Sequence, residues 1–152
     1  MNREPQKLNV EQIYRTNLVI WAALFASQLI LFVVVYFVRP ELFKFDFSIS
    51  PLEGENSNLV LIFAFLAVST AALSFTMKSK FFKQAESEQK PALVQSGQII
   101  ACALCETSSI FGVVLALAFG YRYFFFWIIF GILGIIAHFP RRDPLIAAAY
   151  KR

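Results

Sequence analysis

The sequence predicts an all-α integral membrane protein, built as a bundle of four transmembrane helices. Of its 152 residues, 58% are hydrophobic and 16% are charged, whereas a typical soluble domain is about 45–50% apolar and about 25% charged. The apolar residues gather in four blocks, each close to the ~20 residues that a helix needs to cross the hydrocarbon core. Because lipid cannot pair an exposed strand edge, we expect helices. This composition excludes a soluble enzyme, a disordered chain and a nucleic-acid-binding domain.

The first predicted span, residues 18–38, follows a polar N-terminal tail, residues 1–17. Because the apolar block is too long for a signal peptide and lacks a small-residue cleavage site, we expect an uncleaved anchor. In the outer loop, residues 39–58, three aromatic residues alternate with polar ones, which favours an interfacial segment with its rings at head-group depth. A docking edge for a partner protein is the alternative. The three are Phe43, Phe45 and Phe47.

The remaining spans follow at residues 59–77, 99–119 and 121–139. The polar linker between the second and third spans, residues 78–90, can extend a helix into the cytoplasm. Pro91 then fits the first turn of the next helix, where a missing N–H group does no harm. The four spans together make one transmembrane domain, residues 18–139.

Basic residues predict the orientation. Eleven of the fourteen lysines and arginines lie in the N-terminal tail, in the 78–90 linker and in the C-terminal tail, residues 140–152. These three segments share one side of a four-span protein, and positive residues favour the cytoplasmic side. Both termini are therefore predicted to be cytoplasmic, in a multi-pass protein of the bacterial inner membrane. The net charge of +4 is explained by topology, and no nucleic-acid partner is expected.

Glu106 is the one acidic residue within the four apolar blocks. It lies about seven residues from the cytoplasmic end of the third span, which places it roughly 10 Å deep at about 1.5 Å per residue. An acid in hydrocarbon costs several kcal/mol and is a functional candidate by default. A carboxyl group that is neutral in lipid and charged beside water can carry protons.

The third span also carries a polar stripe and a row of small residues. At helical spacing, Gln98, Cys102, Glu106 and Ser109 share one face. Small residues every third or fourth position allow another helix to approach closely. The predicted helix-packing residues are Gly97, Ala101, Cys105, Gly112 and Ala116.

The segment 91–120 contains ALCE at 103–106 and IFGVV at 110–114. This order of a small and apolar run, Ala-Leu-x-Glu, an aromatic residue, a glycine and an aliphatic run resembles the carboxylate-bearing helix of the rotary ATPase membrane-ring subunit, the c subunit or proteolipid. Residues 59–90 resemble the preceding helix and basic loop of that family more weakly, and they lack its glycine repeat. The resemblance implies that Glu106 is the ion-carrying carboxylate.

Four polar residues are candidates to support Glu106. The resemblance implies that Thr107 and Ser108, directly after the glutamate, help to ligate a sodium ion in sodium-binding members. Ser109 and Gln98 are candidate ion ligands or hydrogen-bond partners along the polar stripe. A Glu106 that is protonated and only hydrogen-bonds across a helix interface is the structural alternative.

The two cysteines, Cys102 and Cys105, are spaced as C-x-x-C. Certain four-helix membrane reductases, such as the vitamin K epoxide reductase family, carry this spacing, but here there is no second cysteine pair to relay electrons. Cysteine also serves as a small buried hydrophobe. His138, at the cytoplasmic end of the fourth span, is expected to be an interfacial residue at a helix end.

We therefore expect a protein that handles protons, or alternatively sodium, through Glu106. No phosphate-binding loop, zinc spacing or hydrolytic triad is present, so neither a cofactor, a metal site nor an independent catalytic activity is expected. Besides the lipid bilayer, the expected partners are further copies of the chain or other membrane subunits. A small accessory or assembly subunit with a structural Glu106 is the second hypothesis. A quinone-linked thiol oxidoreductase is the third.

Overall fold

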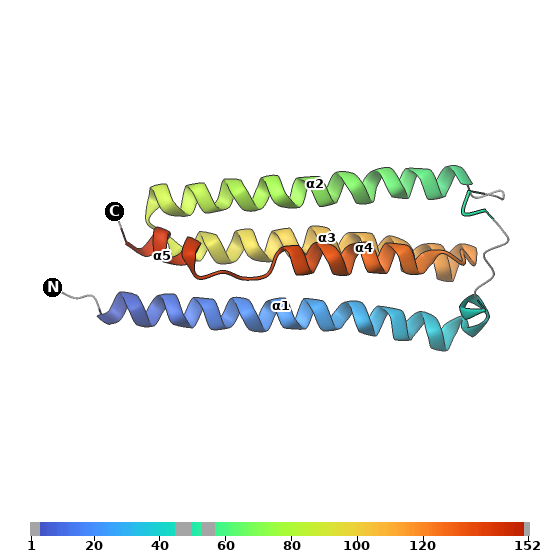
Figure 1. Cartoon of the computed structure of the whole chain (residues 1–152), viewed down its shortest axis with the longest axis horizontal. Coiled ribbons are helices and arrows are strands. Elements are labelled where there is room, and N and C mark those ends of the chain that lie inside the picture. The colour runs from blue at the N-terminus through green and yellow to red at the C-terminus, as the bar shows by residue number, and fades with distance from the viewer. Residues whose placement is uncertain (1–3, 45–49, 53–56, 151–152) are drawn as a thin grey trace.

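The computed structural model of the chain describes residues 4–44, 50–52 and 57–150, and this part of the chain is all-α. Three helices are long and apolar enough to cross a membrane: α1 (Glu4–Val38), α2 (Ser57–Glu88) and α3 (Pro91–Phe119). They lie side by side (Figure 1). The other elements are the 3₁₀ helix η1 (Pro40–Phe43), the shorter apolar helix α4 (Phe124–Ala137) and α5 (Asp143–Ala149).

The helices continue well beyond the apolar spans. α1 includes most of the predicted N-terminal tail, and α2 runs through most of the 78–90 linker. Both polar stretches are rich in glutamate, glutamine, lysine and arginine, which are good helix formers. The predicted extension of the second helix and the helix start at Pro91 are confirmed.

Two predicted regions differ from the structure. The helix expected over 121–139 is only 14 residues long, Phe124–Ala137, or about 21 Å at 1.5 Å per residue. A proline disfavours helical geometry at the residue before it, and Pro140 accounts for the end of α4. Part of the expected C-terminal tail is helical, because α5 packs on α2 and α3 through Leu145 and Ala148.

Of the three aromatic residues noted in the outer loop, Phe45 and Phe47 lie outside the described residues, while Phe43 belongs to η1.

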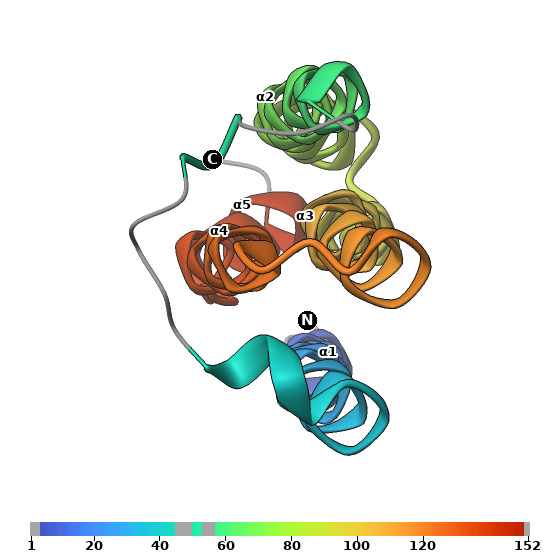
Figure 2. The same ribbon diagram turned by 90° about the vertical axis from the view of Figure 1, so that its right-hand side faces the viewer.

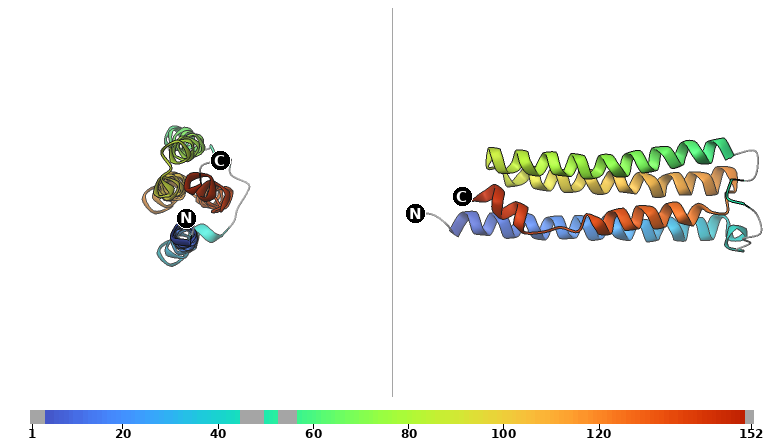
Figure 3. Two further views of the ribbon diagram at one scale, coloured as in Figure 1. Left: turned by 90° about the vertical axis from the view of Figure 1, so that its left-hand side faces the viewer. Right: turned by 45° about the horizontal axis from the view of Figure 1, so that its top comes forward.

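The helix α3 is the centre of the bundle. In the end-on view of Figure 2 it lies between α1 and α2, with α4 beside it. In the apolar stretch of α3, half of the residues are buried, compared with 11% of those in α1 and 17% of those in α2. Figure 3 shows the same arrangement from the opposite end, where the start of α1, the end of α5 and the turn between α2 and α3 lie together. Residues on α3 can therefore contact every other long helix.

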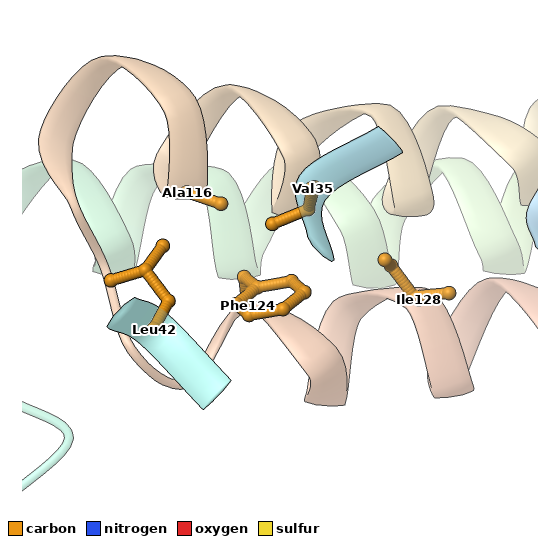
Figure 4. Close-up of a cluster of buried hydrophobic side chains, with 5 residues drawn as sticks. All are labelled: Val35, Leu42, Ala116, Phe124 and Ile128. Carbon is orange, nitrogen blue, oxygen red and sulfur yellow. The ribbon is translucent and has the colours of Figure 1, made fainter. Parts of the chain in front are cut away.

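The half of the bundle near η1 has an apolar interior. One buried cluster joins α1, η1, α3 and α4 (Figure 4). A second joins α2, α3 and α4. The first consists of Val35, Leu42, Ala116, Phe124 and Ile128, and the second of Val60, Ala67, Leu115 and Trp127.

Small residues of α3 lie at its tightest contacts. All five residues expected to pack against other helices (Gly97, Ala101, Cys105, Gly112 and Ala116) are buried. A Cβ atom on Gly112 would lie 2.6 Å from Trp127 Cβ, and one on Gly97 would lie 2.6 Å from Phe81 Cβ. Such approaches are the closest that two helix backbones make in a bundle.

Candidate functional site

Glu106 lies at the middle of α3 and faces α1. Its Oε1 atom is 2.6 Å from Ser27 Oγ, and the side chain is partly buried. Ser27 Oγ also lies 2.7 Å from the Leu24 carbonyl oxygen in its own helix. One acid, one hydroxyl and one backbone carbonyl therefore form a short chain of hydrogen-bonding groups between α1 and α3.

These hydrogen-bonding groups can accommodate either protonation state of Glu106. A serine has one O–H to donate and can accept as well. When Glu106 is ionised, Ser27 donates to the carboxylate. When Glu106 is protonated, its O–H can donate to Ser27 Oγ while Ser27 donates to the Leu24 carbonyl. Rotation of a single hydroxyl hydrogen thus satisfies both forms without moving a heavy atom.

Gln28 extends this first cluster of polar side chains into the bundle. It is fully buried, and its Nε2 donates to Ser27 Oγ at 3.3 Å. Its Oε1 atom has no hydrogen-bond partner among the described residues. Opposite it lies Gly131 of α4, where a Cβ atom would be 3.3 Å from Gln28 Oε1 and 2.1 Å from Ser109 Oγ. A glycine at this position lets polar groups of α1, α3 and α4 converge.

A second cluster of polar side chains lies between α2, α3 and the end of α4. His138 is buried, with its Nε2 atom 2.8 Å from Ser74 Oγ and its Nδ1 atom 3.4 Å from Lys78 Nζ. Cys105 Sγ donates to Ser74 Oγ at 3.5 Å. An ammonium group can only donate, so Nδ1 accepts from Lys78 and Nε2–H donates to Ser74. Ser74 in turn donates to the Ala71 carbonyl at 2.6 Å.

Cys105 belongs to the second cluster and lies, like Ser109 Oγ and Gln28 Oε1, beside Gly131. Its thiol contacts Ser74, and a Cβ atom on Gly131 would lie 3.1 Å from its carbonyl oxygen. We call the whole set the polar seam. The seam contains Lys78, His138, Ser74 and Cys105 toward the cytoplasmic end predicted by the charges, and Glu106, Ser27, Gln28 and Ser109 toward the middle of the bundle.

Side chains from other helices donate hydrogen bonds to carbonyl groups at the C-terminal end of α4. Trp21 Nε1 of α1 donates to the Ile135 carbonyl at 2.8 Å, and Gln98 Nε2 of α3 donates to the His138 carbonyl. Non-helical backbone at membrane depth is tolerated only where protein groups or water satisfy it. The break after α4 is thus stabilised by Trp21 and Gln98.

The residues expected to support Glu106 bond elsewhere. Thr107 donates to the Ala103 carbonyl in its own helix at 3.1 Å, and Ser108 donates to the Trp127 carbonyl at 3.2 Å. Ser109 donates to the Ile128 carbonyl and Gln98 to the His138 carbonyl, whereas the hydroxyl that contacts Glu106 is that of Ser27. In the sequence, Ser27 is distinguished only as one of two adjacent polar residues, with Gln28, in the first apolar block.

Both cysteines are free and buried. Cys102 Sγ accepts from Gln98 Nε2 at 3.5 Å, and Cys105 contacts Ser74. Among residues 4–44, 50–52 and 57–150, no group of three or more histidine, cysteine or acidic residues could hold a metal ion.

Comparison with known proteins does not identify the chain. No family model, curated protein or solved structure matches it. The residues of the site themselves are therefore the basis for a function.

Proposed function

We propose that this chain is a multi-pass membrane protein that takes up and releases protons at Glu106. In this proposal four segments cross the bilayer, the fourth being α4 with the non-helical segment after it, and both termini are cytoplasmic. The setting is the inner membrane of a bacterium. The observation that carries the proposal is the short chain from Glu106 through Ser27 to the Leu24 carbonyl, which accommodates either protonation state.

The polar seam supports exchange of that proton with the cytoplasm. Hydrogen bonds join Glu106 to Ser27 and Gln28 in one set, and Lys78 to His138, Ser74 and Cys105 in another. Both sets reach the surroundings of Gly131. His138 has one ring nitrogen that accepts from Lys78 and one that donates to Ser74, and intramembrane chains of acids and histidines are typical of proton relays. His138 is thus the group through which a proton would pass between the cytoplasm and the seam.

The outer half of the bundle supports a role within an assembly. The two apolar clusters fill it, so a proton on Glu106 meets hydrocarbon side chains in that direction. Release toward the outside would need a polar group from another subunit. Further copies of this chain or other membrane subunits are the partners that we propose, in keeping with the resemblance to the rotary ATPase proteolipid.

Sodium fits the described geometry less well than a proton. A hard cation needs several oxygen ligands. The hydroxyls of Thr107, Ser108 and Ser109 are directed to backbone carbonyls. Ser27 is the side chain that contacts Glu106, and a proton needs only that one partner.

The same contact favours a second candidate function, a small accessory or assembly subunit. The bond from Ser27 to Glu106 joins α1 to α3, and an intramembrane hydrogen bond of this kind contributes about 0.6–2 kcal/mol to helix association. In this case Glu106 would hold the bundle together and keep one protonation state.

Infrared difference spectroscopy separates the two functions. Protein in lipid bilayers is stepped between acidic and alkaline pH in the wild type, in Glu106→Gln and in Glu88→Gln, a control that removes an exposed acid of α2. All ten acidic residues contribute carboxylic-acid bands that disappear on deprotonation. We expect one of these bands to be present in the wild type and the control and missing from Glu106→Gln, with unchanged helix content. An unaltered band in Glu106→Gln would overturn the proposal. Loss of thermal stability in that variant, with no titrating band that depends on Glu106, would favour the accessory role.

A further inference from the structure

A groove lies between α2 and α5 at the predicted cytoplasmic end of the bundle. It has a volume of about 520 Å³ and combines apolar walls with four charged side chains. Phe75, Phe82, Pro144 and Ala147 form the walls. Since Phe75 is 52% exposed and lies just inside the apolar part of α2, the groove starts at the bilayer and opens toward the cytoplasm.

Charges of both signs line the groove in a definite order along α2. Lys78 is the innermost, Lys83 follows, and Glu86 lies two turns beyond Lys78, or about 12 Å at 1.5 Å per residue. Asp143 is the first residue of α5, which packs near Ala85. Along α2, the two lysines therefore lie nearer to the bilayer and Glu86 lies nearer to the cytoplasm.

The four charged groups are available to a ligand. Among the described residues, none of them forms an ion pair. Lys78 Nζ contacts His138 Nδ1 and lies 5.5 Å from the centre of the Phe82 ring, which leaves further donors on the ammonium group. Arg141 adds a nearby positive charge.

We infer that this groove binds a phospholipid whose head group carries both a phosphate and an amine, as phosphatidylethanolamine does. The phosphate lies between Lys78 and Lys83, and the ammonium group extends to Glu86 and Asp143. An acyl chain lies along Phe75 toward the hydrocarbon. Two lysines and two carboxylates line the groove, so a zwitterionic head group matches both signs of charge, whereas the uncharged glycerol of phosphatidylglycerol offers no cation to the carboxylates.

This inference rests on the membrane placement in the proposed function and is independent of proton transfer at Glu106. The protein is reconstituted in nanodiscs with equal amounts of phosphatidylethanolamine and phosphatidylglycerol. Lipids that remain bound after transfer to detergent are counted by native mass spectrometry. Two exposed lysines of α2 give a matched pair, since Lys83 lines the groove and Lys80 does not.

We expect the wild type and Lys80→Gln to retain one phosphatidylethanolamine. Lys83→Gln should retain about tenfold less, as for the loss of one charge-assisted contact. Glu86→Gln should shift retention toward phosphatidylglycerol, because it removes the partner of the amine. Preference for phosphatidylglycerol in the wild type, equal losses in the two lysine variants, or no retained lipid would each overturn the inference. A failure of the infrared test at Glu106 would leave these results unchanged.

Discussion

Substitution of Gly112 by alanine tests the close packing of α3 on α4, on which the geometry of the seam depends. The added Cβ atom would lie 2.6 Å from Trp127 Cβ and 2.8 Å from the Phe124 carbonyl oxygen. Neither atom can be moved by a change of rotamer, since one is a Cβ atom and the other belongs to the backbone. Carbon atoms in contact are normally about 3.5–4.0 Å apart, so the two helices must separate by about 1 Å.

Two opposing effects determine the magnitude. Overpacking of a well-packed interior costs about 1–3 kcal/mol. Replacing glycine by alanine in a helix contributes up to about 1 kcal/mol in the opposite direction. We therefore expect Gly112→Ala to lower the free energy of unfolding by about 1–2 kcal/mol, which is a factor of about 5–30 in the ratio of folded to unfolded protein.

The assay is reversible unfolding of the purified protein in mixed micelles, followed by tryptophan fluorescence. Ala103→Val is the control, because it adds volume at an exposed position of the same helix and should change stability by no more than about 0.5 kcal/mol. Wild-type stability in Gly112→Ala, or an equal loss in the control, would refute the close contact between α3 and α4.

Three further predictions follow from the contacts of the bundle. Gly131→Ala should destabilise the protein in the same assay, because the added carbon would lie 2.1 Å from Ser109 Oγ. Adding Ser109→Ala should restore part of that loss. If the changes in unfolding free energy of the two substitutions simply add in the double variant, the predicted contact is contradicted. Trp21→Phe leaves the Ile135 carbonyl without its donor and should cost about 1–3 kcal/mol in unfolding free energy, whereas an unchanged value would show that this bond does not stabilise the end of α4. Reporter domains fused to either terminus should both be active in the cytoplasm, and a periplasmic signal from one of them would contradict the predicted topology.

The sequence was sufficient to predict the long helices because apolar length is a strong signal. The turn between α2 and α3 followed from the polar linker and from Pro91. The length of α4 was not predicted correctly, since hydrophobicity continues to Phe139 although the helix ends at Ala137. Pro140 indicates that a helix ends before it, but the apolar residues up to Phe139 favoured a longer helix.

The site was predictable only in part. A lone acid in an apolar block singled out Glu106, but its partner Ser27 is 79 positions away in the sequence, and no local pattern links them. Thr107 was a weak choice in physical terms, because adjacent residues of a helix do not face each other. His138 was expected at the membrane interface. The structure places it directly after α4, at a helix end as expected, and buries it against Ser74 of α2.

Reaction with a hydrophobic carbodiimide tests the central claim most directly, because such reagents modify protonated carboxyl groups in apolar surroundings. Membrane-embedded protein is treated across a range of pH and of sodium concentration, and the modified residue is identified by mass spectrometry. We predict that the reagent modifies Glu106, that the reaction is lost as the pH rises, and that Glu106→Gln does not react. Protection by sodium would identify sodium as the ion. A Glu106 that stays unmodified at every pH would contradict proton exchange and favour the accessory role.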